Sequence, residues 1–344
     1  MRPREIVFGL VAIGLVVVYL SLGSRVGPLL VPAGSPTPTP AKPVERVEAP
    51  RVSGAIAFVL RGDVYVLSGG GYVPITSEGR SQQPSLSADG KTIVFARVEQ
   101  IDGKRIVDGQ TVPAQLRFTN VVRKDTAGGA ETVVVSGLVR SPSGFHEVTW
   151  FNAPALSPDG KRIAVTFDAG DGRSDLALYD AQSGRRMAPL SQGSNLADPA
   201  WSPDGTTIAA TSYTLGAPRL LLVATDGRGA NPLKIVPDGE PYRPSYSPDG
   251  RWILYTLRHD GRNDLHVTQV NGTRDIALTT DGRSWNGVFS PDGRQVAFLR
   301  EQGGTIDLFA MDLGEVLSGG VAKQPVKLTR GEGIDGEDRP TWSV

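Results

Sequence analysis

A short turn sequence recurs six times along the chain and constrains the fold more than any other feature. Its full form, Pro-x-x-Ser-Pro-Asp-Gly, occupies residues 154–160, 199–205 and 244–250. The serines that mark all the copies are Ser87, Ser157, Ser202, Ser247, Ser290 and Ser343. They lie 70, 45, 45, 43 and 53 residues apart. A period in the forties with strand-forming content predicts a β-propeller, with one repeat in each blade.

Each copy combines a tight turn with a strand. Proline fixes φ, aspartate bonds its own backbone, and glycine accepts a positive φ. Short apolar segments follow the turns at residues 93–96, 163–166, 208–211, 253–256 and 296–299. Further strands are expected at 175–180 and 264–269, the latter followed by an Asn-Gly hairpin and a fourth strand at 275–279. We therefore predict four antiparallel strands per blade.

The two ends of the chain complete one blade. The last copy stops at Val344 without a second strand behind it, whereas residues 55–58, 63–67 and 72–75 form three strands that lack an innermost partner. We predict that the C-terminal strand pairs beside Ile56 and closes the ring. Such closure removes the exposed sheet edges that would otherwise invite aggregation.

This repeat resembles the WD40-like repeat of the TolB-like β-propeller family, whose signature reads roughly P-x-W-S-P-D-G followed by an I-A-F strand. The resemblance covers about residues 54–344 and implies an all-β, six-bladed propeller over residues 53–344. It is confined to the propeller. TolB carries an α/β domain ahead of its propeller that has no counterpart in this sequence, so we expect no role in a Tol–Pal system.

An apolar, uncharged run from Ile6 to Leu22 follows Arg2 and Arg4. Its length is near the short limit for a transmembrane helix, and the preceding arginines place residues 1–5 in the cytoplasm. We predict a single-pass signal anchor at 6–23, with membrane contact from Ile6 to Gly23. The alternative is a cleaved signal peptide, which would leave the protein secreted, but the following residues match a cleavage site poorly.

Residues 24–52 contain a run of alternating prolines, Ser-Pro-Thr-Pro-Thr-Pro at 35–40. Alternating proline blocks helix and sheet pairing and favours an extended chain. We predict a Pro-rich linker that holds the propeller away from the membrane on its extracytoplasmic side.

Composition excludes several classes of function. The chain has 36 basic and 36 acidic residues and a net charge of zero, so we expect no nucleic-acid binding. It has no cysteine, which rules out thiolate metal sites, a cysteine nucleophile and a lipid-modified cysteine. Its three histidines lack metal-ligand spacing, and no G-x-S-x-G motif occurs. We interpret Asp168, Asp171 and Asp175 as a hairpin tip, and predict no metal site, no cofactor and no catalytic residue.

Propellers usually bind ligands where the loops entering their innermost strands converge. The two residues before each repeated Pro, or before Gly287, should line this channel mouth: Gln82 and Gln83, Asn152 and Ala153, Ala197 and Asp198, Tyr242 and Arg243, Trp285 and Asn286, Asp338 and Arg339. Aromatic, arginine and amide groups are typical of binding hot spots. The predicted binding set is Gln83, Trp150, Asn152, Asp198, Tyr242, Arg243, Trp285, Asn286, Asp338 and Arg339. The alternative is that variable loops simply carry polar residues.

Two insertions enlarge the first repeat, at residues 98–115 and 137–151. The second leads through Trp150 and Phe151 into a strand beside the channel. We expect it to be either a flap or partner contact over the mouth, or a surface insertion.

The sequence favours a membrane-tethered, non-catalytic module that binds a protein or cell-envelope ligand. One alternative is a metal-dependent propeller enzyme of the lyase or lactonase type, for which Asp198 and Asp338 are the candidate ligands. The other is an accessory subunit of a membrane complex, contacted through the apolar helix.

Overall fold

The computed structural model describes most of the chain beyond residue 46. The described ranges are 47–48, 50–108, 110–140, 146–168, 173–190, 195–214, 216–235, 237–320 and 323–344. The predicted membrane segment at 6–23 lies outside the described residues, as do most of the predicted linker and Asp171. Within the described part, no helix combines the length and the apolar character needed to cross a membrane.

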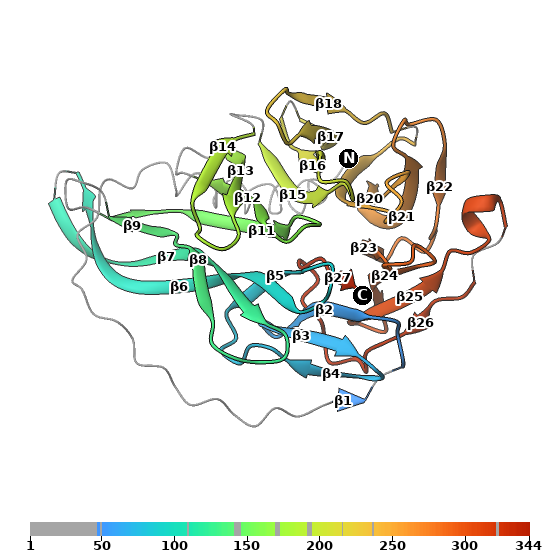
Figure 1. Ribbon diagram of the computed structural model, residues 1–344, viewed down its shortest axis with the longest axis horizontal. Helices are drawn as coiled ribbons and strands as arrows, with labels where there is room; N and C mark the ends of the chain where they lie inside the picture. The colour runs from blue at the N-terminus through green and yellow to red at the C-terminus, as the bar shows by residue number, and fades with distance from the viewer. Residues whose placement is uncertain are drawn as a thin grey trace, which may run out of the picture.

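Six antiparallel sheets form the blades of a propeller (Figure 1), which confirms the predicted all-β, six-bladed fold. From its inner to its outer edge, the first blade contains β27 (Thr341–Ser343), β2 (Ala55–Leu60), β3 (Asp63–Ser68), β4 (Gly71–Pro74) and β1 (Val47–Glu48). The second contains β5 (Ser81–Leu86), β6 (Thr92–Val107), β7 (Gln110–Asp125) and β8 (Thr132–Val135). The third contains β11 (Trp150–Leu156), β12 (Arg162–Asp168), β13 (Ser174–Asp180) and β14 (Arg186–Pro189).

The remaining three blades repeat the same four-stranded order. The fourth contains β15 (Leu196–Trp201), β16 (Thr207–Ser212), β17 (Arg219–Ala224) and β18 (Ala230–Pro232). The fifth contains β19 (Glu240–Tyr246), β20 (Trp252–His259), β21 (Arg262–Gln269) and β22 (Asp275–Ala277). The sixth contains β23 (Ser284–Phe289), β24 (Gln295–Gln302), β25 (Thr305–Asp312), the short 3-10 helix η1 (Val316–Ser318) and β26 (Val326–Lys327).

The chain ends share the first blade. β27 pairs antiparallel with β2, with Trp342 opposite Ile56 and Ser343 opposite Ala55, so the predicted ring closure is confirmed. At the outer edge of the same blade, Val47 of β1 pairs with Tyr72 of β4. The range expected to be linker therefore ends in a short strand that joins the propeller.

The repeated turn is held by its serine. The Ser202 hydroxyl donates to the Asp204 carboxylate over 2.6 Å and accepts from the Thr207 N–H over 2.9 Å. The copies at Ser87, Ser157, Ser247 and Ser290 make the same pair of bonds. The serine hydroxyl holds the pKa of Asp204 below its usual range. The repeated aspartates are thus structural, as the sequence indicated.

We expect Ser202→Ala to lower the free energy of unfolding by about 1–2 kcal/mol, because a largely buried hydroxyl with two partners is lost. Urea denaturation measures this change. Thr206→Ala is the matched control, since its exposed hydroxyl bonds the same carboxylate. An equal loss in the two variants would contradict the role given to the serine.

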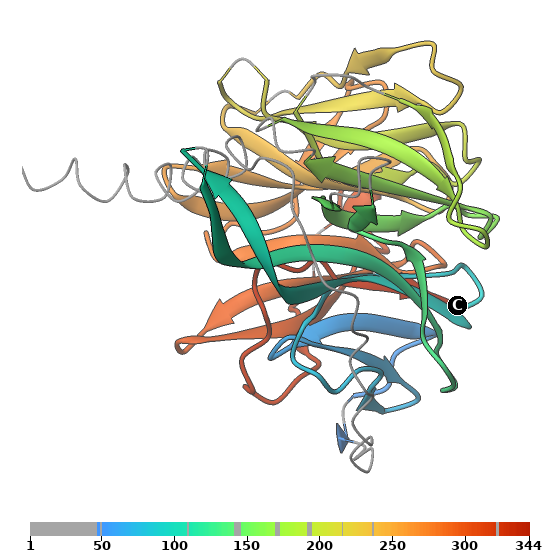
Figure 2. The same ribbon diagram turned by 90° about the vertical axis from the view of Figure 1, so that its left-hand side faces the viewer.

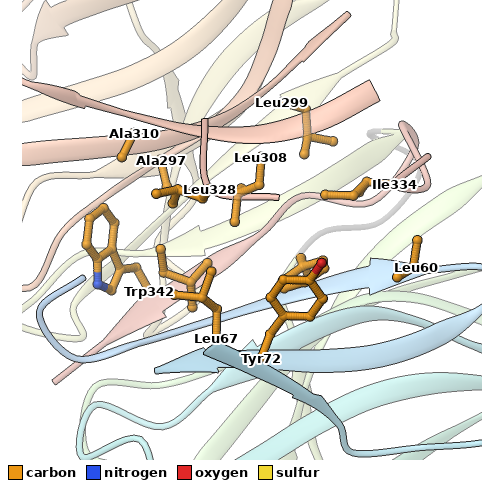
Figure 3. Packing of buried hydrophobic residues seen from close by; sticks show 12 residues of the cluster. Leu60, Leu67, Tyr72, Ala297, Leu299, Leu308, Ala310, Leu328, Ile334 and Trp342 are labelled. Carbon is orange, nitrogen blue, oxygen red and sulfur yellow. The ribbon is translucent and has the colours of Figure 1, made fainter. Parts of the chain in front are cut away.

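Apolar layers between neighbouring blades form the core. The layer at the closure joins the first blade to the sixth: Leu67 and Tyr72 face Leu308 and Leu328, with Trp342 beside them (Figure 3). Tyr72 and Leu67 are fully buried. Burial of this surface stabilises the junction where the first and last blades of the ring meet.

β6 and β7 extend beyond their blade as a two-stranded arm. They pair continuously from Thr92 opposite Asp125 to Val107 opposite Gln110. Figure 1 shows the arm at the left of the molecule, and in Figure 2 it faces the viewer. The first predicted insertion forms this arm.

The second predicted insertion forms a separate small hairpin of β9 (Leu138–Arg140) and β10 (His146–Val148). The hairpin lies against the base of β7, where the Thr119 N–H donates to the Thr149 carbonyl over 3.4 Å. The second insertion therefore packs beside the base of the arm, on the second blade.

Candidate functional site

The innermost strands of five blades carry the same β-bulge, one residue before the repeated Pro or Gly287. Their pairing shifts register at this point, and the bulged residue adopts a left-handed backbone conformation. The φ values are 53° at Gln83, 47° at Ala153, 53° at Asp198, 53° at Arg243 and 57° at Asn286. Such values are uncommon for residues other than glycine, and bulges re-aim side chains. The bulges therefore form a ring of equivalent positions around the channel.

Arg339, in the first blade, closes the channel. Its guanidinium donates through Nη1 to the Pro244 carbonyl and through Nη2 to the Pro199 carbonyl, the latter over 3.0 Å. These carbonyls belong to the fifth and fourth blades, so the side chain spans the ring. The remaining cavity, lined among others by Gln83, Ala153 and Arg339, measures about 30 Å³. That volume holds about one water molecule, so this cavity offers no room for a larger ligand.

Arg243 joins the charged groups of the mouth. Its Nη1 donates to Asn286 Oδ1 over 2.8 Å and its Nη2 to Glu337 Oε2 over 3.1 Å, while its Nε lies 3.6 Å from Asp198 Oδ1. Burial lowers the pKa of Arg243, but the carboxylates of Asp198 and Glu337 outweigh this effect and raise it overall. The guanidinium is therefore fixed and charged, with Glu337 as its solvent-facing partner.

Two aromatic side chains flank this network, each half-buried. Trp285 donates through Nε1 to the Gly336 carbonyl over 2.8 Å, and the Tyr242 hydroxyl donates to Asn263 Oδ1 over 3.1 Å. Burial raises the pKa of Tyr242 to about 12, so its phenol stays protonated at neutral pH. Anchored aromatic rings with a partly exposed face suit the recognition of another molecule.

The two acidic candidates of the mouth already have partners in this chain. The buried Asp338 carboxylate accepts the Gln83 N–H over 2.8 Å, and burial raises its pKa to about 7. Asp198 faces Arg243 and accepts from the Thr211 hydroxyl over 3.4 Å. In the described part of the chain, no cluster of three or more His, Asp or Glu side chains could hold a metal ion.

The other predicted residues lie further from the network. Trp150 begins β11 opposite Asp168, and the Asn152 carbonyl accepts the Thr166 hydroxyl over 3.2 Å. Gln82 lines a second cavity. Glu337 was not among the predicted residues. Only the two residues before each repeated Pro or Gly287 were expected at the mouth, and Glu337 is the third residue before Pro340.

The second cavity lies beside the mouth and measures about 460 Å³, within the range typical of ligand sites. The base of the arm forms one wall, with Val98, Gln100 and Arg117, and residues 335–338 form another. Of the second insertion, residues 137–140 and 146–151, which the structure describes, line neither cavity.

Comparison with known proteins identifies the family. The family model for the TolB β-propeller domain matches residues 140–344, more than half of the chain. The chain belongs to the TolB β-propeller family. Among curated relatives of this TolB-family propeller, the Tol-Pal system protein TolB of Anaeromyxobacter dehalogenans is 35% identical over 104 residues, which is 30% of this chain and 24% of that protein.

Two further similarities bear on fold and function. An uncharacterized peptidase of Bacillus subtilis, YuxL, is 35% identical over 111 residues, which is 30% of this chain and 17% of that protein. The crystal structure of TolB from Acinetobacter baumannii superposes with a TM-score of 0.63 at 19% identity and covers 85% of this chain and 67% of that one. At that identity the superposition shows the fold alone. The matched segments span about a quarter or less of these two curated relatives, so their activities do not transfer to this TolB-family chain.

Proposed function

We propose that this protein is a membrane-tethered, extracytoplasmic and non-catalytic propeller that binds a protein or cell-envelope ligand at its channel mouth. The observation that carries this proposal is the Arg243 network: a charged group fixed by Asp198, Asn286 and Glu337 beside two anchored aromatic rings. Arg339 closes the channel, so the outer rim of the mouth is the surface offered to a partner.

The relatives support an envelope role without assigning a partner. The printed name of the Anaeromyxobacter relative places that protein in a Tol-Pal system. The peptidase relative is matched over 17% of its length, which does not favour peptidase activity here. The proposed tether consists of a signal anchor at 6–23 and the Pro-rich linker that follows it, as far as β1 at Val47.

We expect Trp285→Ala and Arg243→Ala each to weaken partner capture by roughly 30-fold, because hot-spot residues contribute about 2 kcal/mol or more. Full-length protein would be cross-linked in native membranes, and captured partners would be quantified by mass spectrometry. Arg228→Ala is the matched control, since its side chain is 86% exposed on a hairpin remote from the mouth. Undiminished capture by both mouth variants would overturn the proposal.

Metal analysis of the purified protein separates this function from the metal-dependent enzyme. A divalent ion bound in a one-to-one ratio would favour the enzyme. We expect a substoichiometric content that dialysis against a chelator removes without changing partner capture.

A further inference from the structure

The arm exposes an edge of β6 that continues the line of β5. The ladder between β5 and β6 reaches Ser81 opposite Arg97, and the Val98 N–H then donates to the Arg80 carbonyl over 2.8 Å. Beyond this bond β6 pairs on its other side with β7, as far as Val107. In the described part of the chain, no strand pairs with the β5 side of β6 beyond Val98.

The outward backbone groups of this edge follow from the alternation of an antiparallel ladder. The Val98 N–H points to the β5 side, so Gln100, Asp102 and Lys104 direct their N–H and C=O groups to the same side. Three consecutive outward pairs of groups can bind an extended segment of about five residues. An unpaired edge of this kind is a template for strand addition.

The opposite edge of the arm is protected. Pro113, opposite Lys104, occupies an outward position on β7 and has no N–H to donate. Nearer the blade, Thr119 on the same edge bonds to Thr149 beside the β9–β10 hairpin. The two edges therefore differ. On the β7 edge Pro113 lacks a donor and Thr119 is covered, which leaves two outward positions, Gln115 and Arg117, whereas the β6 edge offers three from Gln100 to Lys104.

The open edge leads into the 460 Å³ cavity, and an unpartnered cation lies there. Arg117 lines the cavity opposite Gln100 in the ladder, and it forms no hydrogen bond or ion pair with any residue that the structure describes. Arg80, by contrast, is paired with Glu78 at 2.8 Å and with Glu99 at 3.1 Å. The free positive charge of the cavity is thus on Arg117.

The carboxylates of the lining are engaged. Asp335 accepts the Gly62 N–H over 2.8 Å, and Glu337 is paired with Arg243. Asp338 is buried against Gln83, and Glu99 is paired with Arg80. Glu99 and Glu337 are neutralised by arginines, whereas Asp335 accepts only a backbone N–H and keeps its charge. Arg117 is the group of the lining that is available for a charge-assisted bond with an incoming anion.

Strand direction determines which end of an added segment reaches this arginine. A segment that extends the line of β5 runs antiparallel to β6, from the tip of the arm toward its base. It must stop before Val98, because Arg80 occupies the next position. Its carboxyl end therefore arrives in the cavity.

We propose that the β6 edge from Gln100 to Lys104 binds the C-terminal segment of a partner protein as an added antiparallel strand, with its terminal carboxylate on Arg117. Main-chain bonds supply the affinity, and the carboxylate fixes the register. The site borders the Arg243 network, because Glu337 belongs to both, but the β6 edge and Arg117 take no part in that network. Either proposal can therefore fail while the other stands.

A pool of synthetic random decapeptides tests this proposal against the full-length protein in detergent. One pool has free carboxyl ends and a matched pool is amidated; bound peptides are identified by mass spectrometry. We expect enrichment from the free-carboxyl pool. For the strongest binder, amidation and Arg117→Ala should each weaken binding by about tenfold or more in fluorescence anisotropy. Arg219→Ala, an exposed arginine at the start of β17, should leave the affinity unchanged.

N-methylation of alternate residues in the peptide tests strand addition itself, with no change to the protein. Methyl groups on the residues whose N–H faces β6 should abolish binding, and methyl groups on the intervening residues should be tolerated. Equal binding of the free and amidated pools, an unchanged affinity for Arg117→Ala, or equal effects of the two methylation registers would each overturn the proposal.

Discussion

Trp342→Ala is expected to lower the free energy of unfolding by about 3–5 kcal/mol, the usual cost of truncating a buried tryptophan. The Trp342 residue is only 8% exposed and packs in the layer that contains Ile56 and Leu308. Its Nε1 donates to the Ser53 carbonyl over 2.7 Å. The substitution therefore leaves a cavity and removes the hydrogen bond to Ser53 where the ring closes. Urea denaturation followed by tryptophan fluorescence and circular dichroism measures the loss.

Trp201→Ala is the matched control, because Trp201 holds the same repeat position in the fourth blade, is 9% exposed and donates to the Ala155 carbonyl over 2.9 Å. The two substitutions should lower the free energy of unfolding by similar amounts but loosen different blades. Hydrogen exchange should rise in β2 and β27 for Trp342→Ala and stay unchanged there for Trp201→Ala. A loss below about 1 kcal/mol for Trp342→Ala would contradict a packed closure.

The fold could be predicted because one local rule repeats. The bonds between Ser202, Asp204 and Thr207 lie within six residues, so turn chemistry alone reveals them. The closure was predictable because each blade needs four strands. The three strands near Ile56 lacked an innermost strand, and the C-terminal copy of the repeat had no further strands after it.

A second repeated hydrogen-bonding motif was not predicted, because its residues lie farther apart in the sequence. In three blades an aspartate at or near the start of the third strand accepts from a threonine hydroxyl and from a glycine N–H beyond the fourth strand: Asp63 with Thr76 and Gly79, Asp264 with Thr279 and Gly282, Asp307 with Thr329 and Gly331. The separation ranges from 13 to 24 residues because the hairpins differ in length. A motif with variable spacing gives no fixed period to detect.

The repeat located the candidate site in the sequence, but it did not predict which side chains bond to one another there. Position in the repeat placed Arg243, Asn286 and Arg339 around the channel. The bonds from Arg339 to the Pro199 and Pro244 carbonyls depend on the width of the ring, which sequence does not encode locally. The open edge of β6 depends likewise on where β5 ends in space. These features follow from tertiary geometry rather than from local pattern.

Asp338→Asn should make the stability of the propeller less dependent on pH. Burial raises the pKa of Asp338 from its ordinary value of 3.8 to about 7 in the folded protein. Between about pH 4 and pH 7 the folded state therefore keeps a proton that the unfolded chain releases, so the free energy of unfolding falls as pH rises. Full titration across this window costs on the order of a few kcal/mol. Asparagine has no charge to bury and keeps an oxygen that can accept the Gln83 N–H.

The variant should match the natural protein near pH 4 and exceed its free energy of unfolding at pH 8, as measured by urea denaturation at unit steps of pH. Asp204→Asn is a comparison in which stability should depend on pH in the opposite direction. The Ser202 hydroxyl lowers the pKa of Asp204, so the ionised carboxylate stabilises the fold, and this stabilisation is lost as pH falls below about 4. A difference between Asp338→Asn and the natural protein that stays constant from pH 4 to pH 8 would show that this carboxyl does not titrate in the window.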